Sequence, residues 1–198
     1  MAAVPVTVFS DFACPFSYLA ETALRRLEAE RAVAPEYRAY ELYPAPEPLP
    51  PPVGESEIEA ARALAEELGV ELAPPPRRSR TRKAHEAARL ARERGVEGAF
   101  RDAVFAAYFA RRLDVGRIDV LVALGAAVGL DPSEVKVVLD VDAHAAAVAA
   151  DREVALRAGF EGVPVMVVGR GEAARVLVGA HPYAVLRRAV DETSAAGG

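Results

Sequence analysis

The sequence contains a single cysteine, Cys14, and the residues after it are typical of a helix start. If Pro15 occupies the first helical position, Cys14 becomes the N-cap residue, and its sulfur faces the free backbone N–H groups of Phe16 and Ser17. These donors and the helix dipole favour a thiolate, and the first turn carries no acidic side chain. The pattern therefore predicts an activated nucleophile at Cys14.

Two considerations leave a second interpretation of Cys14 open. A free cysteine is often no more than a small buried hydrophobic residue. In addition, Asp11 is the nearest acidic residue before Cys14, and its carboxylate would oppose a thiolate if the side chain turned inward.

Ser17 stands three residues after Cys14, where a dithiol enzyme would carry its second cysteine. Its hydroxyl can donate a hydrogen bond to a thiolate, but it cannot attack a mixed disulfide and release it. Redox chemistry at Cys14 would therefore use one protein thiol. With one cysteine and three scattered histidines, we expect neither an internal disulfide nor a metal site of the zinc type.

Pro164 is the second candidate element, and it opens the apolar run from Val163 to Val168. Such a run is typical of a central strand that is buried on both faces. A proline at this position is by itself typical of a strand boundary. A cis bond before proline costs only about 0.5 to 1 kcal/mol, so a cis Val163–Pro164 bond is accessible in a folded protein.

The elements that would position these residues follow from hydrophobic periodicity. Residues 4–9 predict a strand, the apolar stripe within 16–27 predicts a helix, and residues 36–43 predict a second strand, which together form a βαβ unit. Six prolines between Pro44 and Pro52 mark a boundary loop. Residues 163–168 and 175–178 predict a closing pair of strands, and 182–191 a final helix with Pro182 in its first turn. Between the two halves, helical spacing covers 56–69, 82–94, 97–112, 117–129, 133–139 and 143–158.

This order of elements predicts an α/β protein with a thioredoxin-like fold (βαβ … ββα) and a large all-helical insertion. We expect a thioredoxin-like domain formed by residues 1–52 and 160–198, and an insertion domain formed by residues 53–159. Four aromatic residues are expected to fill the core of the insertion: Phe100, Phe105, Tyr108 and Phe109.

Composition excludes several classes of function. The chain has 198 residues and a net charge of −5, which gives no overall attraction to nucleic acid or to an anionic membrane. Its N-terminus lacks the pattern of a signal peptide, and the longest nonpolar run, residues 120–130, is too short to span a bilayer. We therefore expect a soluble cytoplasmic protein with no nucleic-acid or membrane partner.

Three segments together resemble the DsbA-like thioredoxin superfamily, in particular its FrnE-type proteins. They are Cys14-Pro15-Phe16-Ser17, the stretch from Arg80 to His85, and Gly162-Val163-Pro164. The 2-hydroxychromene-2-carboxylate isomerases and kappa-class glutathione transferases are close relatives of this group. FrnE-type proteins usually read CPWC, whereas the other two groups usually place serine where Cys14 stands, so the chain combines features of both branches.

The resemblance implies roles for individual residues. Cys14 would be the reacting thiol with Ser17 beside it, and the loop of Val163 and Pro164 would receive the extended backbone of a substrate or of glutathione. The resemblance also suggests that substrate or glutathione contacts include Pro15, Phe16 and Thr81. It implies no tightly bound cofactor, with glutathione or another small thiol as a possible cosubstrate.

Three hypotheses for function remain at this point. The leading one is a monothiol thiol–disulfide oxidoreductase, in which the Cys14 thiolate attacks a disulfide or a glutathionylated protein or small molecule and an external thiol releases the product. The second is a glutathione-dependent isomerase or transferase, in which Cys14 or Ser17 orients glutathione. The third is a non-catalytic binding or chaperone-like module. The oligomeric state stays open, and an exposed Cys14 could link two chains into a homodimer.

Two further features have both structural and functional interpretations. Residues 77–83 contain five cations, which are typical of a solvated surface or a helix start but could also contact the carboxylates of a small thiol. No aromatic residues interleave with them to stack nucleic-acid bases. His85 lies on a predicted helix, where a lone histidine is usually a surface or packing residue.

Overall fold

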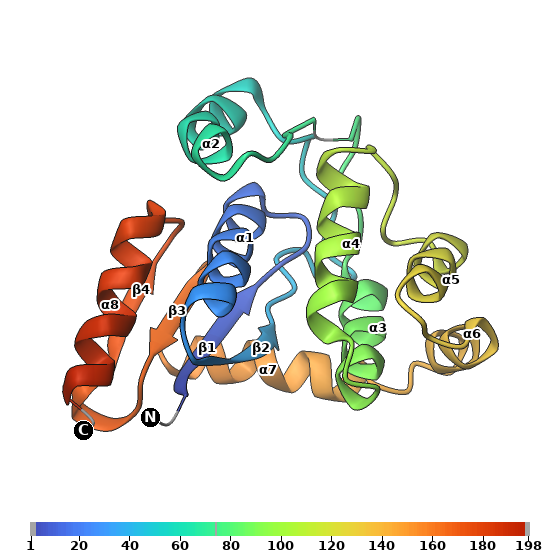
Figure 1. Cartoon of the computed structure of the whole chain (residues 1–198). Helices are drawn as coiled ribbons and strands as arrows, with labels where there is room; N and C mark the ends of the chain where they lie inside the picture. The colour runs from blue at the N-terminus through green and yellow to red at the C-terminus, as the bar shows by residue number, and fades with distance from the viewer. Residues whose placement is uncertain (1–2, 74, 197–198) are drawn as a thin grey trace.

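A four-stranded sheet forms the centre of the thioredoxin-like part, in a computed structural model that describes residues 3–73 and 75–196. The strand order is β2-β1-β3-β4, with β1 parallel to β2 and antiparallel to β3, and β3 antiparallel to β4 (Figure 1). The predicted thioredoxin-like fold with a helical insertion is thus confirmed. The strands span Val4–Ser10 (β1), Val33–Ala39 (β2), Val165–Val168 (β3) and Arg175–Val178 (β4).

Helices cover both faces of this sheet. On one face, α1 (Pro15–Glu30) and α8 (Tyr183–Ala196) pack against β1 and β3 through residues such as Leu24, Leu186 and Val6. On the other face, α7 (Ala145–Arg157) passes beneath the strands in Figure 1, and its Ala155 packs with Phe9 of β1. Because α1 follows β1 directly, its N-terminus lies at the end of a central strand.

The remaining helices lie between β2 and β3 in the sequence. The first of them packs against α1, and the others extend to one side of the sheet (Figure 1). Their bounds agree with the predicted ranges to within three residues. They are α2 (Glu55–Leu68), α3 (Arg82–Glu93), α4 (Glu97–Phe109), α5 (Ile118–Ala127) and α6 (Pro132–Asp140). None of the described helices is long and apolar enough to cross a membrane.

The core of the insertion contains the four aromatic residues predicted for it, each at most 1% exposed. Phe12, Ala13 and Tyr18 from the β1–α1 segment belong to the same cluster. The Tyr18 ring stacks on those of Phe105 and Phe109, with centroids 5.3 and 5.6 Å apart. The loop that carries Cys14 is therefore anchored in the insertion as well as in the sheet.

The division of the chain into residues 1–52, 53–159 and 160–198 stays a prediction. Residues 1, 2, 74, 197 and 198 of these ranges lie outside the part that the structure describes.

Two strands differ from their predicted bounds. β2 covers Val33–Ala39 rather than 36–43, and it includes Pro35, which an edge strand tolerates because one side of its backbone is unpaired. β2 ends at Ala39, and beyond it the N–H of Leu42 donates to the Asp11 carboxylate rather than to a neighbouring strand. β3 begins at Val165, after Val163 and Pro164, since proline has no N–H to offer a ladder.

Candidate active site

Cys14 is the N-cap residue of α1, as the sequence predicts. Pro15 occupies the first turn, and the Cys14 sulfur accepts a hydrogen bond from the N–H of Ser17 at 3.4 Å. No acidic residue lies in this turn. The N–H of Cys14 donates to the carbonyl of Asp11 at 3.1 Å, which closes the short turn between β1 and α1. The end of a strand and the start of a helix thus fix the position of the sulfur.

The loop before β3 meets Cys14 from the other half of the fold. The Val163–Pro164 peptide bond is cis, and the Cys14 sulfur donates to the carbonyl oxygen of Val163 at 3.6 Å. The carbonyl of Pro164 accepts from the N–H of Gly179, which holds the loop against β4. Residues separated by 149 positions in the sequence therefore meet at the thiol, as the resemblance implied.

Burial acts on the Cys14 thiol in the opposite direction to the helix N-terminus. The residue is 6% exposed, and burial raises its pKa to about 11, because a charged sulfur would be removed from water. The negative charge of Asp11 also raises the pKa, whereas hydrogen bonds from Ser17 and from the Phe16 amide lower it. Desolvation outweighs the helix N-terminus, and burial therefore favours the protonated thiol over the thiolate.

The other predicted site residues lie near Cys14 with varied surroundings. Ser17 is fully buried, and its oxygen also accepts from the N–H of Asp11 at 3.3 Å. Pro15 is buried, and Phe16 is partly buried against α2 and the segment that follows it. Thr81 is buried at the start of α3, where its hydroxyl donates to the Asp11 carboxylate at 3.0 Å. Their assigned contacts with a substrate or glutathione stay predictions.

The family profile described as a DSBA-like thioredoxin domain matches residues 5–191. The chain belongs to the DsbA-like thioredoxin family. The uncharacterized protein YwbO of Bacillus subtilis (strain 168) is 31% identical over 147 residues, which cover 69% of this chain and 72% of YwbO.

Solved structures agree with this membership. A probable DsbA oxidoreductase from Streptomyces coelicolor is 30% identical, with a TM-score of 0.81 over 97% of this chain and 90% of its own. A 2-hydroxychromene-2-carboxylate isomerase has the same fold at 19% identity, with a TM-score of 0.78 over 98% and 97% of the two chains. The cytosolic disulfide reductase DsbM from Pseudomonas aeruginosa, solved with GSH, shares the fold at 16% identity, with a TM-score of 0.70 over 98% and 97%.

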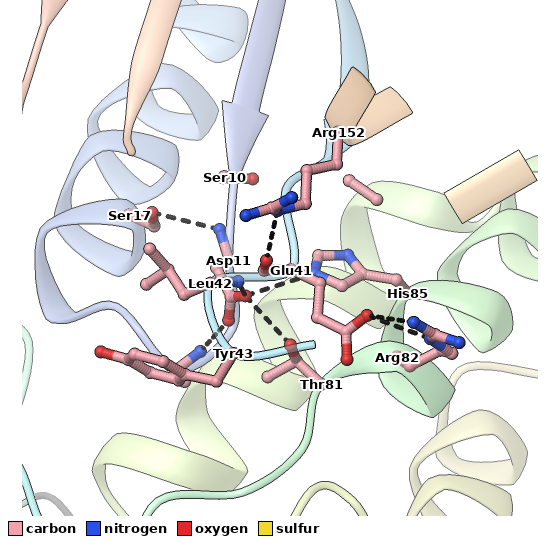
Figure 2. A network of polar contacts seen from close by, with 12 residues as sticks. Ser10, Asp11, Ser17, Glu41, Leu42, Tyr43, Thr81, Arg82, His85 and Arg152 are labelled. Carbon is pink, nitrogen blue, oxygen red and sulfur yellow. Dashed lines mark hydrogen bonds and ion pairs between the residues drawn. The ribbon is translucent and has the colours of Figure 1, made fainter. Parts of the chain in front are cut away.

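In this DsbA-like protein, a polar cluster behind Cys14 joins three parts of the fold (Figure 2). The Asp11 carboxylate accepts hydrogen bonds from the N–H groups of Ala13 and Leu42, each at 2.6 Å, and from Thr81. His85 of α3 lies beside it, with Nε2 4.0 Å from an Asp11 oxygen. The sequence signal for Asp11 was its closeness to Cys14. For His85 the sequence signals were its place on a helix and in the Arg80–His85 stretch that carries the resemblance, and the structure buries it between Asp11 and Phe12.

Sequence reasoning missed a second buried cluster, between Glu21 of α1 and Arg101 of α4. The guanidinium donates to both carboxylate oxygens of Glu21 at 2.6 Å and to the Ser10 hydroxyl at 2.7 Å. It also lies over the ring of Phe12, 4.7 Å from the centroid. Both side chains of the ion pair are 3% exposed, so the pair sits inside the protein. Only the fold brings together two helices that lie 80 residues apart.

The basic run from residue 77 to residue 83 has mostly internal partners. Arg78 pairs with Glu57 at 3.0 Å, Arg82 pairs with Glu41 at 3.0 Å, and Lys83 pairs with Asp142 at 2.6 Å. Arg80 donates to the carbonyl of Tyr43 at 2.6 Å. These cations fasten the start of α3 to the rest of the chain, and the anion contact considered from the sequence stays a prediction.

Within the described residues, His, Cys, Asp and Glu side chains form no group of three that could hold a metal ion.

Proposed function

We propose that this protein is a thiol–disulfide oxidoreductase in which Cys14 is the reacting thiol. One observation carries the proposal: the chain's single cysteine caps the N-terminus of α1 and contacts the carbonyl of Val163, directly before cis Pro164. In this arrangement, the amides at the start of α1 that stabilise a thiolate and the backbone of the Val163 loop lie against the same sulfur atom. Membership of the family and the probable DsbA oxidoreductase at 30% identity support this assignment.

The proposed reaction is an exchange of disulfide partners. The Cys14 thiolate attacks one sulfur of a disulfide or glutathionylated substrate, the substrate S–S bond breaks, and the second sulfur leaves as a thiolate that takes up a proton. An external thiol such as glutathione then attacks the mixed disulfide. It forms a new disulfide with the substrate sulfur and releases Cys14. One disulfide is consumed and one is formed, so the protein returns to its starting state.

Because Cys14 is buried, the thiolate that starts this reaction must form when a substrate or water reaches the sulfur. Desolvation is the main reason why the proton stays on the sulfur, so a substrate or water that reaches the sulfur removes part of that effect. The hydrogen bonds from Ser17 and the Phe16 amide then remain to stabilise the thiolate. We therefore expect the thiol to react slowly with small alkylating reagents at neutral pH, and faster with substrates that occupy the Val163 loop.

Trapping and turnover test the proposal together. Wild-type protein is incubated with glutathione disulfide and with a glutathionylated peptide, and mass spectrometry locates the adduct. We expect a mixed disulfide on Cys14 that added glutathione removes, and catalysed deglutathionylation of the peptide that Cys14→Ser abolishes. Turnover by Cys14→Ser equal to that of wild type would contradict the proposal.

A second variant tests the need for an external thiol. Ser17→Cys places a second thiol one helical turn from Cys14, where it can attack a mixed disulfide within the same chain. We expect release of the first product from this variant without added glutathione, and an internal disulfide in its place. Ser17→Ala is the matched control, because it removes the hydroxyl without adding a nucleophile.

The protonated state of Cys14 favours one alternative function, a glutathione-dependent isomerase or transferase. A thiol that keeps its proton can donate a hydrogen bond to the sulfur of bound glutathione without forming a disulfide. The fold shared with 2-hydroxychromene-2-carboxylate isomerase agrees with this possibility. Isomerisation or conjugation of an aromatic substrate that survives Cys14→Ser, combined with no deglutathionylation by wild type, would favour this alternative.

A further inference from the structure

The Asp11 side chain is completely buried and accepts hydrogen bonds from three segments of the chain (Figure 2). One carboxylate oxygen accepts from the N–H of Ala13, in the loop that leads into Cys14. The other accepts from the N–H of Leu42, just beyond β2, and from the hydroxyl of Thr81 at the start of α3. The two N–H groups can only donate, so both carboxylate oxygens act as hydrogen-bond acceptors. Asp11 thereby joins the Cys14 loop to the helical insertion.

No cation balances this carboxylate directly. Among the described residues, no lysine or arginine nitrogen lies within 4.0 Å of Asp11, and the nearest basic group is His85 at 4.0 Å. His85 is 2% exposed, and neither of its ring nitrogens has a hydrogen-bond partner. The ring packs at a tilt against that of Phe12, with centroids 4.8 Å apart and an interplanar angle of 37°, and this contact holds it beside the carboxylate. The imidazole is therefore an unpartnered polar group aimed at Asp11.

The ionisable groups around the sulfur come from several elements. Asp11 precedes it in the same loop, Tyr43 follows β2, and the Tyr43 ring lies under the Arg78 guanidinium at 5.3 Å. His85 of α3 has Nε2 4.0 Å from an Asp11 oxygen, and Tyr108 of α4 has a raised pKa, mainly because it is buried and in part because of the charge of Asp11. Asp11 is the charged group that raises the pKa of Cys14, and it acts against the amides at the start of α1.

We propose that Asp11 is a positioning residue for Cys14. Its carboxylate ties the loop that carries the sulfur to the start of α3, and its negative charge, three residues from Cys14, opposes ionisation of the thiol. This inference rests on the proposed function, because it concerns how the same thiol is made ready. It gives the insertion a role at the site, since α3 supplies both Thr81 and His85. A substitution or movement at the start of α3 would then alter the surroundings of Cys14 through the Asp11 carboxylate.

The pH dependence of Cys14 alkylation tests the charge separately from the hydrogen bonds. Asp11→Asn removes the negative charge, and we expect its alkylation midpoint to fall by about one pH unit, which gives a rate about tenfold higher below both midpoints. Thr81→Val removes one hydrogen bond from the carboxylate but keeps the charge, so its midpoint should not fall. Asp102→Asn, on the exposed side of α4, controls for loss of a negative charge elsewhere.

Two results would overturn the proposal: an unchanged or higher midpoint in folded Asp11→Asn, or an equal downward shift in Thr81→Val. Circular dichroism and thermal melting show whether each variant is folded. If Asp11→Asn does not fold, carboxyl ¹³C NMR of wild-type protein decides. By reciprocity, the Asp11 resonance must shift at the pH where Cys14 loses its proton, and this step must be absent in Cys14→Ser. Absence of that step in wild type would overturn the inference.

The outcome is distinguishable from failure of the proposed function. A lowered midpoint in Asp11→Asn, together with no deglutathionylation by wild type, would remove the oxidoreductase assignment and leave the role of Asp11 intact. Deglutathionylation by wild type, together with an unchanged alkylation midpoint in Asp11→Asn, would keep the oxidoreductase assignment and remove the proposed role of Asp11.

Discussion

Two buried carboxylates on the β1–α1 segment link the sheet to the insertion, and they are balanced in different ways. Glu21 faces the guanidinium of Arg101 on α4 in a two-pronged ion pair. Asp11 faces neutral donors, with His85 of α3 as the nearest basic group. The first arrangement cancels its charge within the pair, whereas the second leaves a negative charge three residues from the thiol. Burial alone therefore does not decide whether a carboxylate serves stability or chemistry.

The largest effect should follow from breaking the balanced pair. Arg101→Met leaves the Glu21 charge buried without its partner, and we expect a loss of about 3 to 5 kcal/mol in the free energy of unfolding. Urea denaturation measures this loss. In the double variant Glu21→Leu with Arg101→Met, most of the stability should return, because no unpaired charge remains. A double variant as unstable as the single one would mean that Arg101 acts through packing and Ser10 rather than through Glu21.

Cys14 should make the free energy of unfolding fall at alkaline pH. The folded Cys14 keeps its proton up to a pKa of about 11, whereas the unfolded thiol loses it near the ordinary value of 9.0. Between these values the unfolded state binds fewer protons, so the Cys14 contribution to stability is complete below pH 9 and is lost as pH rises toward 11. We expect about 2 to 3 kcal/mol to be lost in wild type relative to Cys14→Ser over this range. Parallel stability curves for the two proteins would contradict the raised pKa.

A smaller loss of stability should follow from removing one hydrogen bond to the Asp11 carboxylate. Thr81→Val removes a buried hydrogen bond to Asp11, and we expect a loss of about 2 kcal/mol in the free energy of unfolding, because hydrogen bonds to charged groups are stronger than average. Thr22→Val is the matched control, since the Thr22 hydroxyl donates only to the carbonyl of Tyr18 in its own helix. Equal losses from the two threonines would mean that the Asp11 cluster adds nothing special to stability.

The smallest effect should come from a third link between the same two parts, the exposed ion pair of Arg25 on α1 and Asp102 on α4. Their atoms lie 3.3 Å apart, and the side chains are 35% and 52% exposed. Asp102→Asn should cost about 0 to 1 kcal/mol of stability, and less in high salt, because solvent and ions screen the pair. Thermal unfolding at two salt concentrations measures it. A loss comparable to that of Arg101→Met would show that exposure does not separate these links.

Much of the fold was predictable because it depends on nearest neighbours along the chain. The apolar periodicity located α1, β3, β4 and the insertion helices, and the Cys14–Pro15 pair located the helix start. β2 was placed too late in the chain, and the N–H of Leu42, which was expected to lie in this strand, donates instead to Asp11, 31 residues away in the sequence. Local pattern contains no information on such a partner.

The features of the candidate site also fall into those set by local sequence and those set by tertiary packing. The sequence by itself determined that one thiol caps a helix and that no second cysteine stands at Ser17, because capping and spacing are local properties. Only the tertiary structure decided that burial raises the pKa of the thiol and that Thr81 and His85 lie beside Asp11. The physical reason is that desolvation depends on everything packed around a group, and the residues that surround Cys14 lie up to 149 positions away in the sequence.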